Sequence, residues 1–470
     1  MVAELISAVN GFVWGVPMLI LIMGTGLYLT IRLGVLQFRK LGKAFYYMAH
    51  NEKGAEGEVS SFAALCTALA ATIGSGNIVG VATAMGIGGP GALFWMVLAA
   101  CLGMATKYAE GVLAIKYRHL DGNGKALGGP FLYIEKGMGD KFKWLGVFFA
   151  IFAMGAGLLG IGTMVQTNSI TSAVQSFFDP NMENTITLFG NEYTMALAVS
   201  AVVVAILTAL VVVGGLHRIS TVATYIVPFM AIIYVIVCVA ILIYNISHIP
   251  AAFAIIFESA FGGEAVAGGV VGAILISMKA GVARGVFSNE AGLGSAPIAA
   301  AAAQTKEPVR QGLVSMTGTF LDTIVICTMT GLTIVITESW NIGLEGAAVT
   351  VNAFGKGLPW APEVGAFILM VCLAFFAFTT ILGWNYYSER CLVYLTKEKN
   401  SILVVFRWVW VLTVLIGPFV ALDTVWLLAD TFNGMMSIPN LIALLALSGV
   451  VCKETKSYFE RLNSGEIQDR

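Results

Sequence analysis

Two long hydrophobic stretches of the chain are interrupted at their middles by small and polar residues. The first covers residues 61–85 and is interrupted at 72–77, and the second covers 266–303 and is interrupted at 277–285. Lipid cannot satisfy the backbone amides and carbonyls that a broken helix exposes, so such a break lies against protein, water or a ligand. The pattern predicts two discontinuous membrane helices with one binding site between them.

Hydrophobic runs of membrane-spanning length recur along the whole chain. A span requires about 20 apolar residues, and about eleven runs reach that length. The candidate spans are residues 13–33, 61–85, 91–117, 144–175, 195–214, 219–245, 266–303, 313–338, 363–396, 404–421 and 425–452. The sequence therefore predicts an all-α polytopic membrane protein with about eleven transmembrane helices.

Composition agrees with this class. Hydrophobic residues make up 58% of the chain, charged residues 11%, and the mean hydropathy is +0.86, whereas an average soluble protein is about half apolar and a quarter charged. The net charge is −1 and the basic residues lie between hydrophobic runs, which excludes a nucleic-acid-binding face. The seven cysteines lie in or beside apolar segments without a CxxC pair, so they are expected to pack as small hydrophobic residues.

Charge distribution predicts the orientation. Lys and Arg follow every second candidate span, at 39–43, 116–143, 218, 306–310, 397–399 and 453–461. Cytoplasmic loops are enriched in these residues. We therefore expect a multi-pass protein of the cell membrane, with its amino terminus outside and its carboxyl terminus in the cytoplasm.

The order of the spans predicts an inverted repeat. If the first span is set aside, two sets of five remain, and an odd number of spans inverts the second set relative to the first. The expected parts are residues 1–60 (a first helix and a cytoplasmic loop), 61–245 (the first five-helix repeat), 246–265 (an extracellular connection), 266–452 (the second repeat) and 453–470 (a cytoplasmic tail). Inverted repeats that each contain an unwound helix are typical of secondary transporters. We expect the chain to function as a monomer.

Three segments carry a resemblance to a known family. They are Thr72–Gly80, Gly88–Ala92 and Gly285–Pro297, of which residues 288–297 are the most specific. In these segments, and from its first span to its last, the chain resembles the alanine or glycine:cation symporter family. The resemblance implies sodium-coupled uptake of alanine or glycine on a leucine-transporter-like core of ten helices, with one extra amino-terminal helix.

The first break offers groups that bind an amino acid. The amides that follow Gly74 begin a half-helix, where backbone N–H groups bind anions, and small residues there admit a carboxylate. On the fourth span, the carboxamide of Gln166 is expected to contact the substrate, although it could equally bridge two helices. Met278 and Trp384 are expected to fill the volume of a longer substrate side chain, with ordinary packing as the alternative. The expected substrate-binding residues are Thr72, Ser75, Gly76, Asn77, Gln166, Ser277, Met278, Gly281 and Trp384.

Similarity to the leucine-transporter class also implies a sodium site. It places the carbonyls of Ala70 and Ile73 and the hydroxyls of Thr379 and Thr380 on the ion. In the alternative, both threonines donate to carbonyls of their own helix. Proton-coupled members of that superfamily place a lysine of the fifth core helix at this position, and residues 219–245 contain none.

Several charged residues fall within spans, where each costs about 2.5–3.5 kcal/mol on insertion scales. Lys107 and Glu110 lie three residues apart on one span and are expected to pair with each other. The partners of Arg284, Glu290 and Asp322 stay open.

The predicted function is a symporter that imports alanine, glycine or both by alternating access, with sodium as the co-transported ion. Transport of another small neutral amino acid, proton coupling and a channel are the alternatives. An enzyme is not expected, because no histidine or pair of carboxylates is placed at membrane depth to act as a base or to bind a metal. No metal other than sodium is expected.

Overall fold

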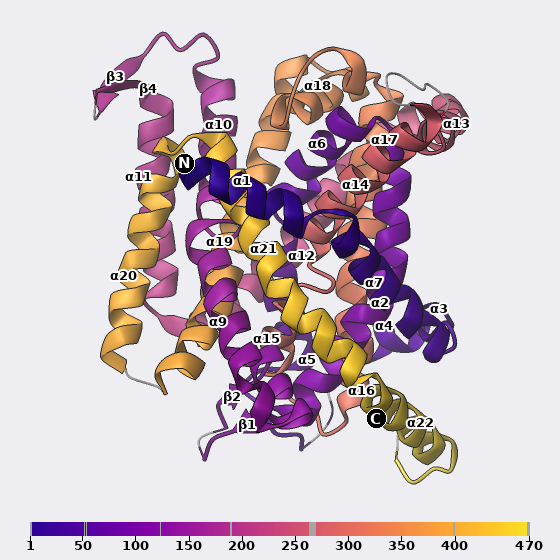
Figure 1. Ribbon diagram of the computed structural model, residues 1–470. Coiled ribbons are helices and arrows are strands. Elements are labelled where there is room, and N and C mark those ends of the chain that lie inside the picture. Colours follow the sequence, from indigo (N-terminus) through magenta and orange to yellow (C-terminus); the bar gives the residue numbers. More distant parts are fainter. Residues whose placement is uncertain are drawn as a thin grey trace.

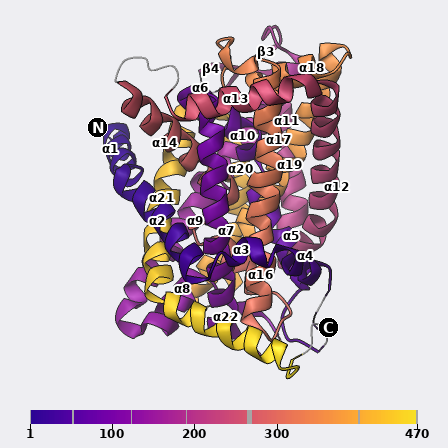
Figure 2. The same ribbon diagram turned by 90° about the vertical axis from the view of Figure 1, so that its right-hand side faces the viewer.

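The computed structural model describes residues 2–50, 52, 54–122, 124–188, 190–262, 269–397 and 400–467. Most of its helices run side by side in a bundle (Figures 1 and 2). Two short antiparallel hairpins lie at opposite ends of this bundle, β1 (His119–Leu120) with β2 (Ala126–Leu127) and β3 (Thr185–Leu188) with β4 (Asn191–Thr194).

The helices follow the chain in two halves. The first half contains α1 (Val2–Val13), α2 (Val16–Arg32), α3 (Leu36–Arg39), α4 (Leu41–Ala49), α5 (Ser61–Thr72), the 3-10 turn η1 (Ser75–Asn77), α6 (Val79–Gly88), α7 (Gly91–Tyr117), α8 (Pro130–Tyr133), the π-helical turn η2 (Ile134–Met138), the 3-10 turn η3 (Asp140–Phe142), α9 (Lys143–Leu159), α10 (Met164–Phe178), α11 (Met195–Val212) and α12 (Gly215–Tyr244). The second half contains η4 (Ile246–His248), α13 (Ile249–Ala260), α14 (Gly269–Asn289), α15 (Ala296–Ala300), α16 (Pro308–Thr319), the π-helical segment η5 (Phe320–Cys327), α17 (Thr328–Ile336), η6 (Ser339–Asn341), α18 (Ala347–Gly357), α19 (Pro362–Thr396), α20 (Asn400–Ile416), η7 (Gly417–Phe419), α21 (Leu422–Ala446) and α22 (Ser448–Asn463).

The helices have the length and composition of membrane spans. Within the described ranges, nine helical segments are long and apolar enough to cross a bilayer, and α21 with α22, bent by 56°, makes a possible tenth. The predicted class, an all-helical polytopic membrane protein, is confirmed. Three short pieces of the expected parts lie outside the described residues. They are 263–265, at the end of the expected connection, 266–268, at the start of the expected seventh span, and 468–470, at the end of the expected tail.

The first predicted break is present. α5 ends at Thr72 and α6 begins at Val79, so each half has only 12 or 10 residues. At about 1.5 Å per residue neither half is long enough to cross a bilayer alone. The two halves flank the short turn η1, which is fully buried.

The second predicted break is present but displaced. α14 continues through residues 277–285 without interruption, and the chain unwinds at 290–295 instead. Glycines inside 277–285 serve close packing: a Cβ at Gly281 would lie 2.2 Å from the carbonyl oxygen of Ala92 on α7. The actual break contains Gly292 and Gly294, both with a positive φ (89° and 84°) that glycine adopts without strain. The small residues at 277–285 were therefore misinterpreted as a break.

The expected fourth span is also interrupted. α9 ends at Leu159 and α10 begins at Met164. The glycines at the end of α9 pack against other helices, with Gly157 against Trp384 and Gly160 against Ala429. The interruption that follows them was not predicted.

Two helices lie across opposite ends of the bundle (Figure 2). α13 lies within the connection expected at 246–265, with Ala252 and Ile256 buried and Phe253 and Phe257 exposed. α22 holds the basic residues expected in the tail. These positions define the α13 end and the α22 end of the bundle.

The close approach of α14 to α7 gives a stability prediction. Gly281→Ala is expected to lower the free energy of unfolding by about 1–3 kcal/mol, because its methyl group must separate the two helices. Gly272→Ala on the same helix has nothing within 4 Å of its new Cβ and is expected to change little. Thermal unfolding in detergent compares the two variants, and equal melting temperatures would contradict the packing role of Gly281.

Candidate functional site

The first break is closed by hydrogen bonds from side chains. The Gly74 amide donates to Asn77 Oδ1 (2.8 Å), and the Ser75 amide donates to Gln166 Oε1 (3.1 Å). Gln166 Nε2 in turn donates to the carbonyl of Ile161 (2.9 Å), at the interruption between α9 and α10. All three polar side chains of this arrangement, Ser75, Asn77 and Gln166, are buried. The amides of Gly74 and Ser75 thus have partners that lipid could not supply.

Glycine is required at position 74. A Cβ there would lie 2.4 Å from Thr380 Oγ1 and 3.2 Å from Gln166 Oε1. The break therefore touches α10 on one side and α19 on the other. On a third side, a Cβ at Gly76 would lie 3.1 Å from the Cα of Ser288 and 3.3 Å from the ring of Phe287, near the end of α14.

Asp322 joins the first break to the end of α14. Its carboxylate accepts from Asn77 Nδ2 (2.7 Å), Ser288 Oγ (2.8 Å) and Thr323 Oγ1 (2.7 Å). It lies in the π-helical segment η5, a distortion that often occurs at functional sites. Sequence reasoning left Asp322 outside the site, although a lone carboxylate in an apolar span was the available signal.

The second break is held by two buried carboxylates. Glu290 has a φ of 57° and accepts from Trp384 Nε1 (2.8 Å) and from Ser295 Oγ (2.5 Å). Glu110 of α7 accepts from the Gly292 amide (3.1 Å) and from Asn440 Nδ2 (2.7 Å) through one oxygen. The motif that carried the family resemblance, 288–297, is thus the break itself.

The structure brings some of the predicted ion ligands together. Thr380 Oγ1 lies 3.4 Å from the carbonyl oxygen of Ile73. Both threonines also donate to Phe376 of their own helix, Thr379 at 2.9 Å and Thr380 at 3.1 Å, as the alternative interpretation expected. A hydroxyl that donates to its helix still has lone pairs for a cation. Ala70 lies in the last turn of α5, fully buried.

Other predicted residues lie apart from the first break. Ser277 faces Gly88, at the far end of α6, and Gly281 faces Ala92 of α7. Met278, between them on α14, is partly buried. Trp384 lies at the second break, where it donates to Glu290.

The charged residues of the spans have partners that the sequence did not indicate. Arg284 of α14 forms two hydrogen bonds with Asp430 of α21 (2.7 and 3.2 Å), and its guanidinium lies 4.7 Å from the centre of the Trp426 ring. The predicted Lys107–Glu110 pair is absent. Among the described residues the Lys107 ammonium has no hydrogen-bond partner, because Glu110 is directed to the second break.

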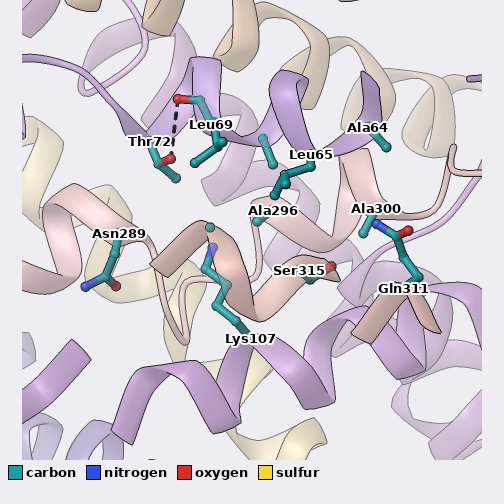
Figure 3. Close-up of a pocket in the computed structure, with 12 residues that line it drawn as sticks. Ala64, Leu65, Leu69, Thr72, Lys107, Asn289, Ala296, Ala300, Gln311 and Ser315 are labelled. Carbon is teal, nitrogen blue, oxygen red and sulfur yellow. Dashed lines mark hydrogen bonds between the residues drawn. The ribbon is translucent and has the colours of Figure 1, made fainter. Parts of the chain in front are cut away.

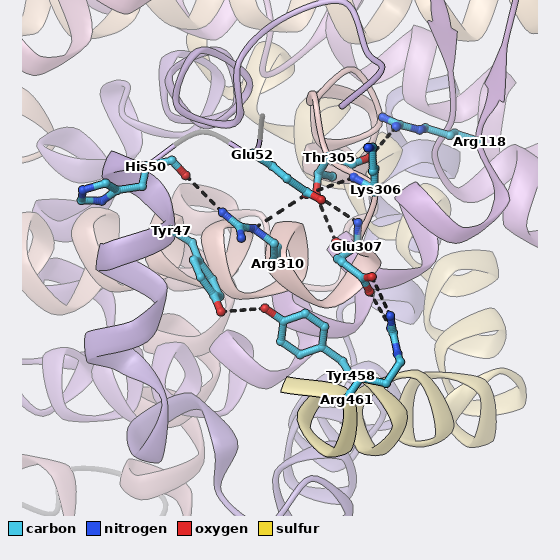
Figure 4. A network of polar contacts seen from close by, with 10 residues as sticks. All are labelled: Tyr47, His50, Glu52, Arg118, Thr305, Lys306, Glu307, Arg310, Tyr458 and Arg461. Atoms are coloured by element: carbon cyan, nitrogen blue, oxygen red, sulfur yellow. Dashed lines mark hydrogen bonds and ion pairs between the residues drawn. The ribbon is translucent and has the colours of Figure 1, made fainter. Parts of the chain in front are cut away.

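A polar network closes the α22 end of the bundle (Figure 4). Arg118 donates to the carbonyls of Glu56, Ala301, Ala303 and Thr305 at 2.5–3.0 Å. The segments before α5 and after α15 are therefore fastened to each other below the two breaks.

Ion pairs extend this closure. Arg461 of α22 binds Glu307 through two hydrogen bonds (2.7 and 2.8 Å), and Arg390 of α19 lies 3.0 Å from Glu58, just before α5. Burial raises the pKa of the Glu58 carboxyl, although Arg390 opposes that shift. The attraction between Glu58 and Arg390 is thus partly offset by the cost of removing the Glu58 carboxylate from water.

Buried polar groups that converge on helix breaks at membrane depth define a class, the membrane transporters with discontinuous helices. A sequence model of the sodium:alanine symporter family matches residues 1–470, and the chain belongs to that family. The family resemblance of the sequence is confirmed. The family consists of transporters and not of enzymes.

Individual relatives are similar over nearly their whole length. A protein of Methanococcus maripaludis named sodium/alanine symporter AgcS is 50% identical over 465 residues, 97% of each chain. A Haemophilus influenzae protein named only as an uncharacterised transporter is 53% identical over 463 residues, 98% of this chain and 97% of its own. The probable sodium/glutamine symporter GlnT of Bacillus subtilis is 35% identical over 467 residues, 98% of this chain and 92% of its own.

The contact between Trp384 and Glu290 gives a second stability prediction. Trp384→Phe keeps the ring but removes the only N–H of the side chain, so it leaves one oxygen of a buried carboxylate without its donor. We expect a loss of about 1–3 kcal/mol of unfolding free energy. Trp144→Phe, at a position that is 64% exposed, is the matched control. A melting temperature equal to that of the control would contradict the anchoring role of this hydrogen bond.

Proposed function

We propose that this chain is a sodium-coupled symporter that carries alanine or glycine into the cell by alternating access. The observation that carries the proposal is the first break, where the Ser75 amide donates to Gln166 and the Ile73 carbonyl lies 3.4 Å from Thr380 Oγ1. Donors for a carboxylate and oxygens for a cation lie there side by side. In this proposal the amino acid and the sodium ion bind at the same unwound turn.

The substrate exchanges hydrogen bonds with this turn. Its carboxylate replaces Gln166 Oε1 at the amide of Ser75, and the released carboxamide oxygen accepts from the ammonium group. The hydroxyl of Ser75 is buried without a hydrogen-bond partner among the described residues and is a further donor. Thr72, Gly76 and Asn77 complete this side of the proposed site.

The sodium ion is proposed to bind the carbonyls of Ala70 and Ile73 and the hydroxyls of Thr379 and Thr380. The close approach of Thr380 Oγ1 to the Ile73 carbonyl supports this set. Carbonyls at the end of the half-helix α5 also carry the negative end of its dipole, which attracts a cation.

The residues of α14 receive a different assignment. Ser277, Met278 and Gly281 lie outside the proposed site because Ser277 packs against Gly88 at the far end of α6 and Gly281 packs against Ala92 of α7. Trp384 acts as a positioning residue through Glu290. Phe287, packed against Gly76, replaces Met278 as the proposed limit on the length of the substrate side chain.

The proposed layout has eleven spans, in which α5 and α6 are the halves of the second and α14 and α15 the halves of the seventh. The first helix and loop occupy residues 1–60, the two inverted five-helix repeats 61–245 and 266–452, the connection 246–265 and the tail 453–470. Arg118, Lys306 and Arg461 gather at the α22 end, which supports placing that end in the cytoplasm. The amino terminus is then outside, in the cell membrane, and the chain functions as a monomer.

One alternative substrate has a specific observation in its favour. The relative named as a probable sodium/glutamine symporter is 35% identical to this chain, so the shared fold does not fix the substrate. Glutamine, a longer neutral amino acid, is therefore the second candidate, and proton coupling remains the alternative for the ion.

Uptake into proteoliposomes tests the ion and the substrate. We expect alanine accumulation that depends on an inward sodium gradient and is competed by unlabelled glycine, because sodium completes the site for the amino acid. Uptake that is unchanged when potassium replaces sodium at fixed pH would contradict sodium coupling. Sodium-dependent accumulation of labelled glutamine, without accumulation of alanine or glycine, would instead favour glutamine as the substrate.

The first break is tested by Asn77→Ala. Removal of the carboxamide takes a partner from the Gly74 amide and from Asp322, so we expect alanine affinity to fall at least about tenfold, the effect of about 1.4 kcal/mol. Asn181→Ala, in an exposed loop, is the control. Sodium-dependent binding to purified protein is the measurement, and a folded Asn77→Ala variant with unchanged affinity would place the substrate elsewhere.

A further inference from the structure

Lys107 of α7 is a buried cation without a partner. It is 3% exposed, and among the described residues its ammonium group donates no hydrogen bond. Three buried acids interact with its charge, Glu110, Glu290 and Asp322, and each receives hydrogen bonds from other groups. Among the described residues, Glu110 Oε2 receives none. A buried ammonium group without a partner costs several kcal/mol. Such a group is expected to gain a partner in another state of the protein or from a ligand.

The ammonium points into a small cavity between α5, α7, α15 and α16. The cavity measures about 20 Å³, and Ala64, Ala68, Ala296 and Ala300 form much of its wall. Figure 3 shows the Lys107 side chain directed toward Thr72 and Ala296, with Gln311 at the other end of the cavity beside Ala300. Because these alanine side chains are small, the cavity becomes larger if one of the helices that line it moves away.

Gln311 supplies the second observation. It is 1% exposed, and its Oε1 atom accepts no hydrogen bond among the described residues. The cavity therefore has an unused cationic donor at one end and an unused neutral acceptor at the other. An α-amino acid matches both, because its carboxylate binds an ammonium group and its own ammonium group binds a carbonyl oxygen.

The cavity adjoins both breaks. Thr72, the last residue of α5, and Asn289, the last of α14, line it. Asn289 donates to Thr323 (3.0 Å), which donates to Asp322, the residue that holds Asn77. The cavity therefore extends from the first break along α5, whose residues Thr72 and Ala64 both line it.

We propose that Lys107 and Gln311 form a second, transient site for the transported amino acid on its way to the cytoplasm. The inference rests on the proposed function and orientation. The cavity in this structure is large enough for water only, so the site forms when α5 moves away from α7 and α16. α5 can move because the unwound residues Ile73 and Gly74 separate it from α6.

The contacts that hold α5 in place are those of the α22 end. Val59, two residues before α5, forms a strand-like bridge with Ala303, and its carbonyl accepts from the Gln304 amide (2.8 Å). Glu58 adds the ion pair with Arg390. Release of these contacts opens the cavity to the cytoplasm, where the substrate passes from the first break to Lys107 and then into solution.

Lys107→Met and Gln311→Leu are the test variants, and both faces of the membrane must be measured. Right-side-out vesicles report the KM for alanine from the outer face, and inside-out vesicles report it from the cytoplasmic face. We expect each variant to raise the cytoplasmic KM at least about tenfold, equal to about 1.4 kcal/mol, while the outer KM stays within about twofold of wild type. Lys107→Arg, which keeps the charge, is expected to stay closer to wild type.

Lys116→Met removes a partly exposed lysine of the same helix and controls for loss of charge. A KM that rises equally on both faces, or on neither, would overturn the proposal. Restoration of the cytoplasmic KM in the double variant Lys107→Met/Glu110→Gln would also overturn it, because Lys107 would then serve only to balance Glu110. If Lys107→Met does not fold, an unchanged cytoplasmic KM in Gln311→Leu decides against the site. Absence of sodium-dependent alanine uptake in wild-type vesicles would instead contradict the proposed function.

Discussion

The structure depends on one constraint: backbone groups of an unwound membrane helix must find partners within the protein. At the first break, Asn77 and Gln166 supply these partners to the amides of Gly74 and Ser75. At the second, Glu110 and Asn440 serve the backbone of Gly292. Apart from Asn77 of the turn itself, the side chains that satisfy the breaks come from α7, α10 and α21, so the breaks fix how these helices pack.

The same constraint concentrates polar chemistry in a small volume. Asp322 accepts from Asn77 of the first break and from Ser288 at the end of α14, and thereby joins the two discontinuous helices. A ligand that exchanges one of these hydrogen bonds alters the contact between the breaks. The proposal requires that binding of the ion affects binding of the substrate. The hydrogen bonds of Asp322 offer a short connection through which this coupling can act. The closure at the α22 end, held by Arg118, fastens the segment that follows α15, the helix after the second break.

Sequence patterns predicted the class of fold and the first break because both follow from local rules. Hydrophobic length marks a span, and a run such as 72–77 marks an interruption. The predicted position of the second break was wrong by several residues because glycines serve two purposes in membrane helices. At Gly281 a glycine admits a neighbouring helix, whereas at Gly292 it adopts a positive φ, and the sequence alone does not distinguish them. The partners of Lys107, Arg284 and Glu290 depend on how distant helices pack, which a single sequence does not encode.

The central claim is that the unwound turn between α5 and α6 binds both the amino acid and the ion. A structure of the purified protein with alanine and sodium, determined by electron cryo-microscopy, tests it most directly. The account predicts density for the alanine carboxylate at the amide of Ser75, with Gln166 moved from its present contact, and an ion between the Ile73 carbonyl and Thr380. Alanine bound elsewhere, with the Ser75–Gln166 hydrogen bond intact, would contradict it.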